Sequence, residues 1–169
     1  MITARRLLAL GAMLVAAAVF AAEISIDADR TVDFTAFKTY AWKGGTPAAD
    51  AALNADIVAD IDEQLAAKGL KKAEKDPDLY VHYHAKQRDD VKITDWDEGK
   101  FKFENRNISE SWAKVGTLAV DLVDPKTGTV LWRAAVTDTL KSKTVTPEFK
   151  EMLKRNIALM FSQYPPKKS

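Results

Sequence analysis

Five short stretches of the chain alternate apolar with polar residues, a period of two that predicts β-strands with one buried face. They cover residues 24–27, 39–42, 79–87, 116–123 and 130–136. Gly44-Gly45-Thr46-Pro47 ends the second stretch, because glycine and proline interrupt regular structure. The last two stretches flank residues 124–128, a turn with proline early and glycine where a positive φ is required, so they predict an antiparallel hairpin. The inward positions of the final strand are predicted to be Val130, Trp132, Ala134 and Val136, and Trp42 is predicted to join the core from the second strand.

Two longer segments repeat apolar residues every three or four positions, which is the spacing of an amphipathic helix. The first stripe runs from Leu53 to Leu65, and its helix is predicted to end at Lys68-Gly69, where glycine takes the left-handed position. The second helix is predicted to begin at Thr146-Pro147, because threonine caps a helix and proline fits its first position. Pro165-Pro166 ends it.

The order of these elements is strand, strand, helix, strand, charged segment, strand, strand, helix. This order predicts an α+β fold in which one mostly antiparallel sheet carries both helices on one face, while the other face can stay in water. Residues 89–114 form the charged segment, and a structureless loop of that length would be unusual in a compact domain. We therefore expect a hairpin or an extended excursion that lies back on the sheet.

The start of the chain has the pattern of an export signal. Arg5-Arg6 precedes an apolar stretch of 16 residues, Leu7 to Ala22, with small residues at its end. A membrane-spanning helix needs about 20 residues, so we expect cleavage after Ala21 and keep an uncleaved anchor, the only membrane contact expected, as the alternative. The prediction is a leader over 1–21, one domain over 22–164 and a disordered tail over 165–169, in a protein that is periplasmic or secreted from a bacterium.

Composition removes several classes of function. The chain has 25 Lys and Arg against 24 Asp and Glu, a net charge of +1 that becomes −1 when the leader's two arginines are removed. Such a balance gives no electrostatic reason to expect nucleic-acid binding. The absence of cysteine excludes disulfides, thiolate zinc sites, iron–sulfur clusters, cysteine nucleophiles and the thioether anchor of a lipoprotein.

His82 and His84 are the only histidines, and as strand neighbours at i and i+2 they project to the same side. Two imidazoles bind Zn²⁺ or Cu²⁺ weakly, and a stable site needs a third or fourth ligand. Asp78 lies on the same strand face but about 13 Å from His82 along the strand. We therefore expect two solvated histidines, keep them as weak metal candidates, and assign no metal and no cofactor.

The charged segment also contains the strongest candidates for catalysis and for contact with a partner. Asp95, Asp97 and Glu98 flank an aromatic residue, and paired acids hydrolyse glycosides, so a hydrolase of an envelope polymer acting through carboxylates in residues 89–114 is one alternative. No serine-nucleophile or phosphate-loop motif is present, so no catalytic residue is assigned and a non-enzymatic domain is expected. A possible contact surface for an envelope protein or a cell-wall glycan consists of Trp96, Phe101, Phe103 and Trp112. The alternative is that these aromatic residues pack onto the open face of the sheet.

Several stretches, taken in order, resemble one bacterial envelope family, the domain-of-unknown-function family 4136. They are Asp33-Phe34, Phe37-Lys38-Thr39-Tyr40-Ala41-Trp42, Leu65-Ala66-Ala67-Lys68-Gly69-Leu70, residues 76–84, residues 116–124 and Leu131-Trp132-Arg133-Ala134. The resemblance implies an α+β fold in a secreted or lipid-anchored protein with no assigned activity and no catalytic residues. This chain departs from the lipoprotein form because no cysteine follows its leader.

Overall fold

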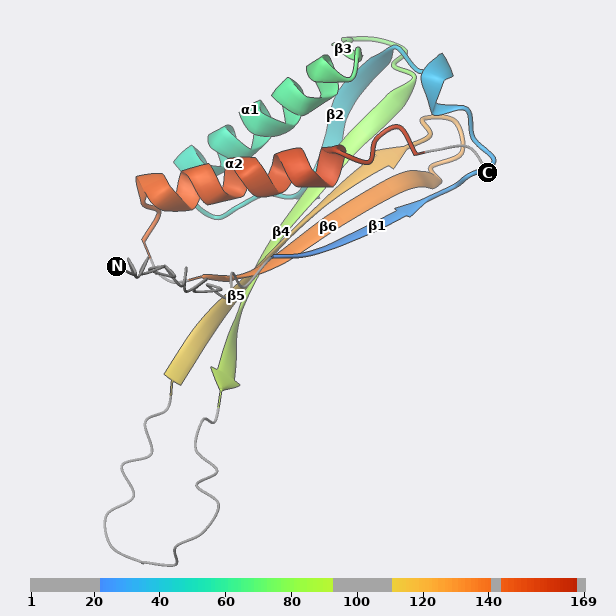
Figure 1. Ribbon diagram of the computed structural model, residues 1–169. Helices are drawn as coiled ribbons and strands as arrows, with labels where there is room; N and C mark the ends of the chain where they lie inside the picture. Colours follow the sequence, from blue (N-terminus) through green and yellow to red (C-terminus); the bar gives the residue numbers. More distant parts are fainter. Residues whose placement is uncertain (1–21, 93–110, 141–143, 167–169) are drawn as a thin grey trace, which may run out of the picture.

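The computed structural model describes residues 22–92, 111–140 and 144–166 of the chain (Figure 1). Its strands are β1 (Glu23–Ala28), β2 (Thr39–Thr46), β3 (Lys71–Lys72), β4 (Leu79–Lys92), β5 (Ser111–Val123) and β6 (Val130–Leu140). Its helices are α1 (Ala51–Ala67), α2 (Pro147–Phe161) and a single 3₁₀ turn, η1 (Phe34–Ala36). The predicted leader with its cleavage point after Ala21 lies outside the described residues, as do the last three residues of the predicted tail. In the part of the chain that the structure describes, no helix has the length and apolar character needed to span a bilayer.

The six strands form one sheet in the order β1-β6-β5-β4-β2-β3. The pairs β1–β6, β6–β5 and β5–β4 are antiparallel, whereas β2 pairs in parallel with both β4 and β3. The parallel pair follows from the connection through α1, since parallel neighbours need a crossover, usually a helix. Both helices cover the same face of the sheet (Figure 1), which confirms the predicted α+β fold.

The turn and the helix ends lie where the sequence predicts them. Gly128 has a φ of +73°, and its N–H donates to the Asp124 carbonyl at 2.9 Å, closing the β5–β6 hairpin. Gly69, with a φ of +85°, follows the end of α1 as predicted. At the start of that helix is a cap that the sequence did not predict: the Asp50 carboxylate accepts from the Leu53 N–H at 2.7 Å. The Thr146 side chain caps α2 in the same way.

The core lies between the helices and the inner face of the sheet. Its centre is an aromatic cluster in which the Trp132 ring lies 5.1 Å from the Phe161 ring and 5.6 Å from the Tyr164 ring, centroid to centroid. Trp132 is fully buried, as predicted. Trp42 is only half-buried, because its indole N–H reaches the Asp62 carboxylate of α1 at 2.8 Å. The inward placement of Val130 is wrong: it is 41% exposed, at the start of β6 directly after the turn.

Two strand boundaries differ from the prediction. β2 does not end at Gly44 but continues to Thr46, with an irregular register between Trp42 and Gly45. A Cβ atom on Gly45 would lie 2.1 Å from the Tyr83 carbonyl oxygen, so glycine there permits the close approach of β2 to β4.

The second difference concerns the charged segment, residues 89–114. Its two ends belong to β4 and β5, which pair without interruption from Tyr80–Val123 to Lys92–Ser111. β4 and β5 therefore reach into the segment from both sides, and their ribbon extends beyond the ends of the helices (Figure 1). The rest of the predicted hairpin or excursion is not tested. Residues 93–110 lie outside the described part of the chain.

Candidate functional site

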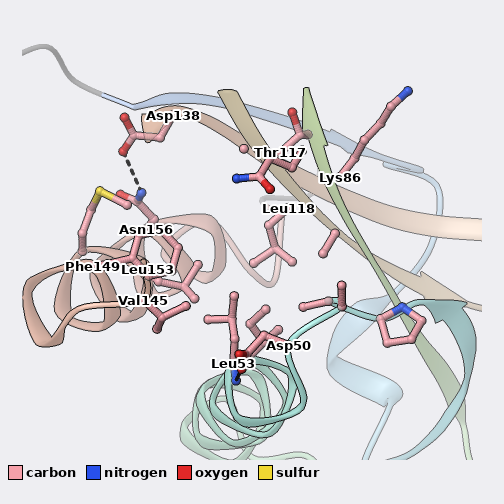
Figure 2. Close-up of a pocket in the computed structure, with 18 of the residues that line it drawn as sticks. Asp50, Leu53, Lys86, Thr117, Leu118, Asp138, Val145, Phe149, Leu153 and Asn156 are labelled. Carbon is pink, nitrogen blue, oxygen red and sulfur yellow. Dashed lines mark hydrogen bonds between the residues drawn. The ribbon is translucent and has the colours of Figure 1, made fainter. Parts of the chain in front are cut away.

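A pocket of about 650 Å³ lies between the two helices and the sheet, where the N-terminal parts of α1 and α2 face β4, β5 and β6 (Figure 2). The helices run side by side in the same direction (Figure 1), and they are joined by the ion pair of Lys150 with Asp56 at 2.8 Å and that of Lys154 with Glu63 at 2.9 Å. Their N-termini therefore lie at the same end of the molecule. The volume lies in the range of about 300–1,000 Å³ that is usual for small-molecule sites.

The pocket exists because two small residues stand at helix-facing positions of the sheet. Ala85 of β4 pairs with Leu118 of β5, and in the next row Gln87 pairs with Gly116. One row in the other direction, Tyr83 and Val120 are buried and fill the space below the helices. The methyl group of Ala85 and the hydrogen atom of Gly116 fill less space than the side chains of Tyr83 and Val120. The sheet therefore leaves a hollow at the N-terminal ends of the helices.

The walls of the pocket are mostly apolar and come from elements far apart in the sequence. Leu53 and Ile57 contribute from α1, Phe149 and Leu153 from α2, and Val145 from the segment before α2. Figure 2 shows the labelled members of this set gathered around the hollow, with Leu118 on the sheet side. Such a lining favours a ligand with a substantial apolar part.

One end of the pocket is polar. Asn156 is only 4% exposed, and its Nδ2 donates to the Asp138 Oδ2 at 3.2 Å (Figure 2). The other Asp138 oxygen accepts from the backbone N–H of Thr139 at 2.8 Å. Within the described ranges, no Lys, Arg or His side chain lies within ion-pair distance of the Asp138 carboxylate. Among the described residues, the Asp138 carboxylate at this end is therefore hydrogen-bonded but has no cationic partner.

The remaining charged groups of the lining do not change this picture. Asp50 uses its carboxylate to cap α1. Lys86 borders the pocket, but its side chain points away from the hollow (Figure 2). The pocket thus combines apolar walls, one buried amide and an excess of negative charge.

His82 and His84 lie on the opposite face of the sheet, away from the helices, where their alternation with buried residues placed them. The His84 Nδ1 lies 3.1 Å from the Thr46 Oγ1, and its Nε2 lies 4.0 Å from the Asp121 Oδ2. His82 stands opposite Asp121 in the register. Burial lowers the pKa of His82, the Asp121 charge opposes that change, and the His84 and Lys43 charges add to it.

Asp121 itself is committed to an ion pair. The Arg133 Nε and Nη2 each donate to one Asp121 oxygen at 2.6 Å, a bidentate arrangement that raises the pKa of the Arg133 guanidinium. Asp78 lies at the start of β4, where it accepts hydrogen bonds from Lys38 and Thr39. Among the described residues no cluster of three or more histidines and carboxylates could hold a metal ion. His84 is exposed to solvent, but the His82 Nε2 is buried without a hydrogen-bond partner.

The contact surface expected from the sequence cannot be placed. Trp96, Phe101 and Phe103 lie outside the described residues, and so do the candidate acids Asp95, Asp97 and Glu98. The backbone of Trp112 pairs with that of Val91 in the β4–β5 ribbon, and its side chain also lies outside what the structure describes. The sequence interpretation missed the pocket, although small residues at inward strand positions, Ala85 and Gly116, were a signal for it.

Comparison with known proteins gives a family and a fold. The family model for the domain of unknown function DUF4136 matches residues 24–166. A search of the curated proteins found no match.

Two solved structures share the fold. The first is a PDZ domain protein from Parabacteroides distasonis, with a TM-score of 0.56 and 20% identity over 88% of this chain, which spans 36% of that protein's chain. The second is PelC from Paraburkholderia phytofirmans, solved as a dodecamer, with a TM-score of 0.51 and 13% identity over 84% of this chain and 96% of PelC. At these identities the similarity concerns the fold alone.

Proposed function

This chain belongs to the domain-of-unknown-function family DUF4136, and from that premise we propose that it is a non-enzymatic binding domain of the bacterial cell envelope. The leader pattern of residues 1–21 supports export. The ligand binds in the pocket between the helices and the sheet. An envelope protein or a cell-wall glycan is the partner proposed for the charged segment, residues 89–114.

The pocket is the observation that carries this proposal. It has the volume and the apolar lining of a small-molecule site, with Asp138 and Asn156 hydrogen-bonded to each other at one end. Both of its carboxylates already accept hydrogen bonds from the protein, Asp50 as a helix cap and Asp138 from Asn156 and Thr139. These roles suit a site that recognises a ligand better than one that transfers protons.

The test blocks the pocket without disturbing the core. The full chain is expressed with its leader and purified from the periplasmic fraction, and binding is followed by the fluorescence of the neutral apolar dye N-phenyl-1-naphthylamine. Leu53→Trp fills the pocket from a half-buried position on α1 and is expected to reduce dye binding at least tenfold. Ala55→Trp places the same side chain at an exposed position of that helix, outside the lining, and is the matched control.

Wild-type protein and Ala55→Trp are expected to bind the dye equally. Equal binding by Leu53→Trp would show that the dye does not occupy the pocket. No binding by the wild type would contradict the proposed function, and absence of the protein from the periplasmic fraction would contradict the proposed location.

A further inference from the structure

The two ends of the pocket differ in polarity. Leu53, Ile57 and Leu153 line the part enclosed by the helices. Asp138 and Asn156 lie together where β6 and α2 meet. A ligand that satisfies both ends has an apolar body and a polar group at one end.

The charge at the polar end determines the kind of group that fits. Asp138 has no cationic partner within the described ranges, and its Asn156 contact satisfies only one lone pair of one carboxylate oxygen. Asp50, the other acid of the lining, lies across the hollow beside Leu53, where its carboxylate caps α1, and the Lys86 ammonium points away. A cationic donor is therefore favoured beside Asp138, where an anionic group would be repelled by the carboxylate.

We infer that the ligand is a single-chain amphiphile with a primary ammonium group, which pairs with Asp138 while the chain lies along the apolar walls. This inference rests on the proposed binding function. If each non-hydrogen atom takes about 30 Å³, the volume per water molecule in the liquid, a pocket of about 650 Å³ accommodates about 20 such atoms. A chain of ten carbon atoms with its head group fits within this limit.

The experiment compares three probes that share one chain and differ in the charge of the head group: decylammonium, decanol and decanoate. Each is used to displace N-phenyl-1-naphthylamine from the purified full chain at neutral pH, below its micelle concentration. Decylammonium is expected to displace the dye at about one tenth of the decanol concentration, because a charge-assisted hydrogen bond is worth about one power of ten in affinity. Decanoate is expected to be the weakest of the three.

Two variants test whether Asp138 causes the preference. Asp138→Asn keeps the shape and an oxygen acceptor for Asn156 but removes the charge, so decylammonium and decanol should become equal. Asp76→Asn removes the same charge from an exposed turn outside the lining and should leave the tenfold preference intact. The wild-type ranking is informative by itself if Asp138→Asn does not fold.

The outcomes separate the two proposals. Equal displacement by the three probes, a preference for decanoate, or a preference that survives in Asp138→Asn overturns the ammonium assignment and leaves the binding function in place. If the dye does not bind to the wild type at all, or if none of the probes displaces it, the proposed binding function fails together with the assignment.

Discussion

Replacing Trp132 by alanine tests the centre of the core. Trp132 projects from β6 towards α2, is fully buried, and packs against Phe161 and Tyr164. Alanine leaves a cavity between the sheet and the helix, bordered by these two rings. The residues around this cavity belong to β1, β5 and α2. Each of these elements is held by other contacts, so the site can collapse only in part.

The expected cost is large. An aromatic side chain buries about 150–250 Å², which at about 25 cal/mol per Å² corresponds to about 4–6 kcal/mol of burial free energy. The Trp132 Nε1 is buried without a hydrogen-bond partner in the described structure, and an unsatisfied donor costs about 1–3 kcal/mol, a penalty that alanine removes. The difference of the two is about 1–5 kcal/mol. Because the cavity adds to the loss, we expect the usual cost of Trp→Ala in a core, about 3–5 kcal/mol of unfolding free energy, or a fall in Tm of about 10 °C for a domain of this size.

Trp132→Phe separates the two contributions. Phenylalanine keeps a ring against Phe161 and has no N–H to leave unpaired, so its cost should be less than half that of alanine. Urea unfolding followed by far-ultraviolet circular dichroism gives both values without using the altered tryptophan as the reporter.

Two results would refute this reasoning. A fall in Tm of only a degree or two for Trp132→Ala would place the indole outside the core. Equal costs for Trp132→Phe and Trp132→Ala would mean that a benzene ring recovers none of the packing of the indole, because both variants remove the N–H.

Two further substitutions have matched controls. Gly45→Ala should cost more than about 3 kcal/mol in urea unfolding, because its Cβ would meet the Tyr83 carbonyl. Gly44→Ala, with open space around it, should cost about 1–2 kcal/mol because of its positive φ. Equal costs would contradict the close approach of β2 to β4. The pKa of Asp78 is lowered mainly by the hydrogen bond from the Lys38 backbone N–H and next by that from the Thr39 hydroxyl. Its carboxylate therefore stabilises the fold at pH values above the ordinary pKa of 3.8, and this effect is lost as the pH falls through the lower pKa of the folded state. Asp78→Asn should therefore cost about 1 kcal/mol at pH 7, and this cost should shrink as the pH falls below 3.8. Asp76→Asn should change the stability at neither pH, and a pH-independent cost for Asp78→Asn would contradict the role of its charge.

The elements that depend on local pattern were predictable from the sequence. Alternation predicted the inward and outward faces of β4, and the apolar stripe together with Lys68-Gly69 predicted the limits of α1 to within two residues. The β5–β6 hairpin followed from one turn sequence. These features depend on residues that are neighbours along the chain, so a single sequence contains the necessary information.

The features that the sequence did not reveal depend on contacts between distant segments. Gly45 was read as the end of a strand, but its function is to let the backbone of β2 approach Tyr83, about forty residues away. The pocket forms because the starts of both helices meet above Ala85 and Gly116. The sequence of neither helix indicates that the other packs beside it. Trp42 carried an apolar pattern, but an acid on α1 holds its N–H near the surface.

The position of β1 determines how the domain would be held if the predicted leader were retained. β1 is an edge strand that begins at Glu23, so only Ala22 separates it from the predicted cleavage point. A retained leader would have almost no tether, since one extended residue spans about 3.3 Å, and it would hold this side of the sheet against the bilayer surface. Cleavage after Ala21 would instead remove this tether, so a single peptide bond determines whether β1 is held at the membrane surface.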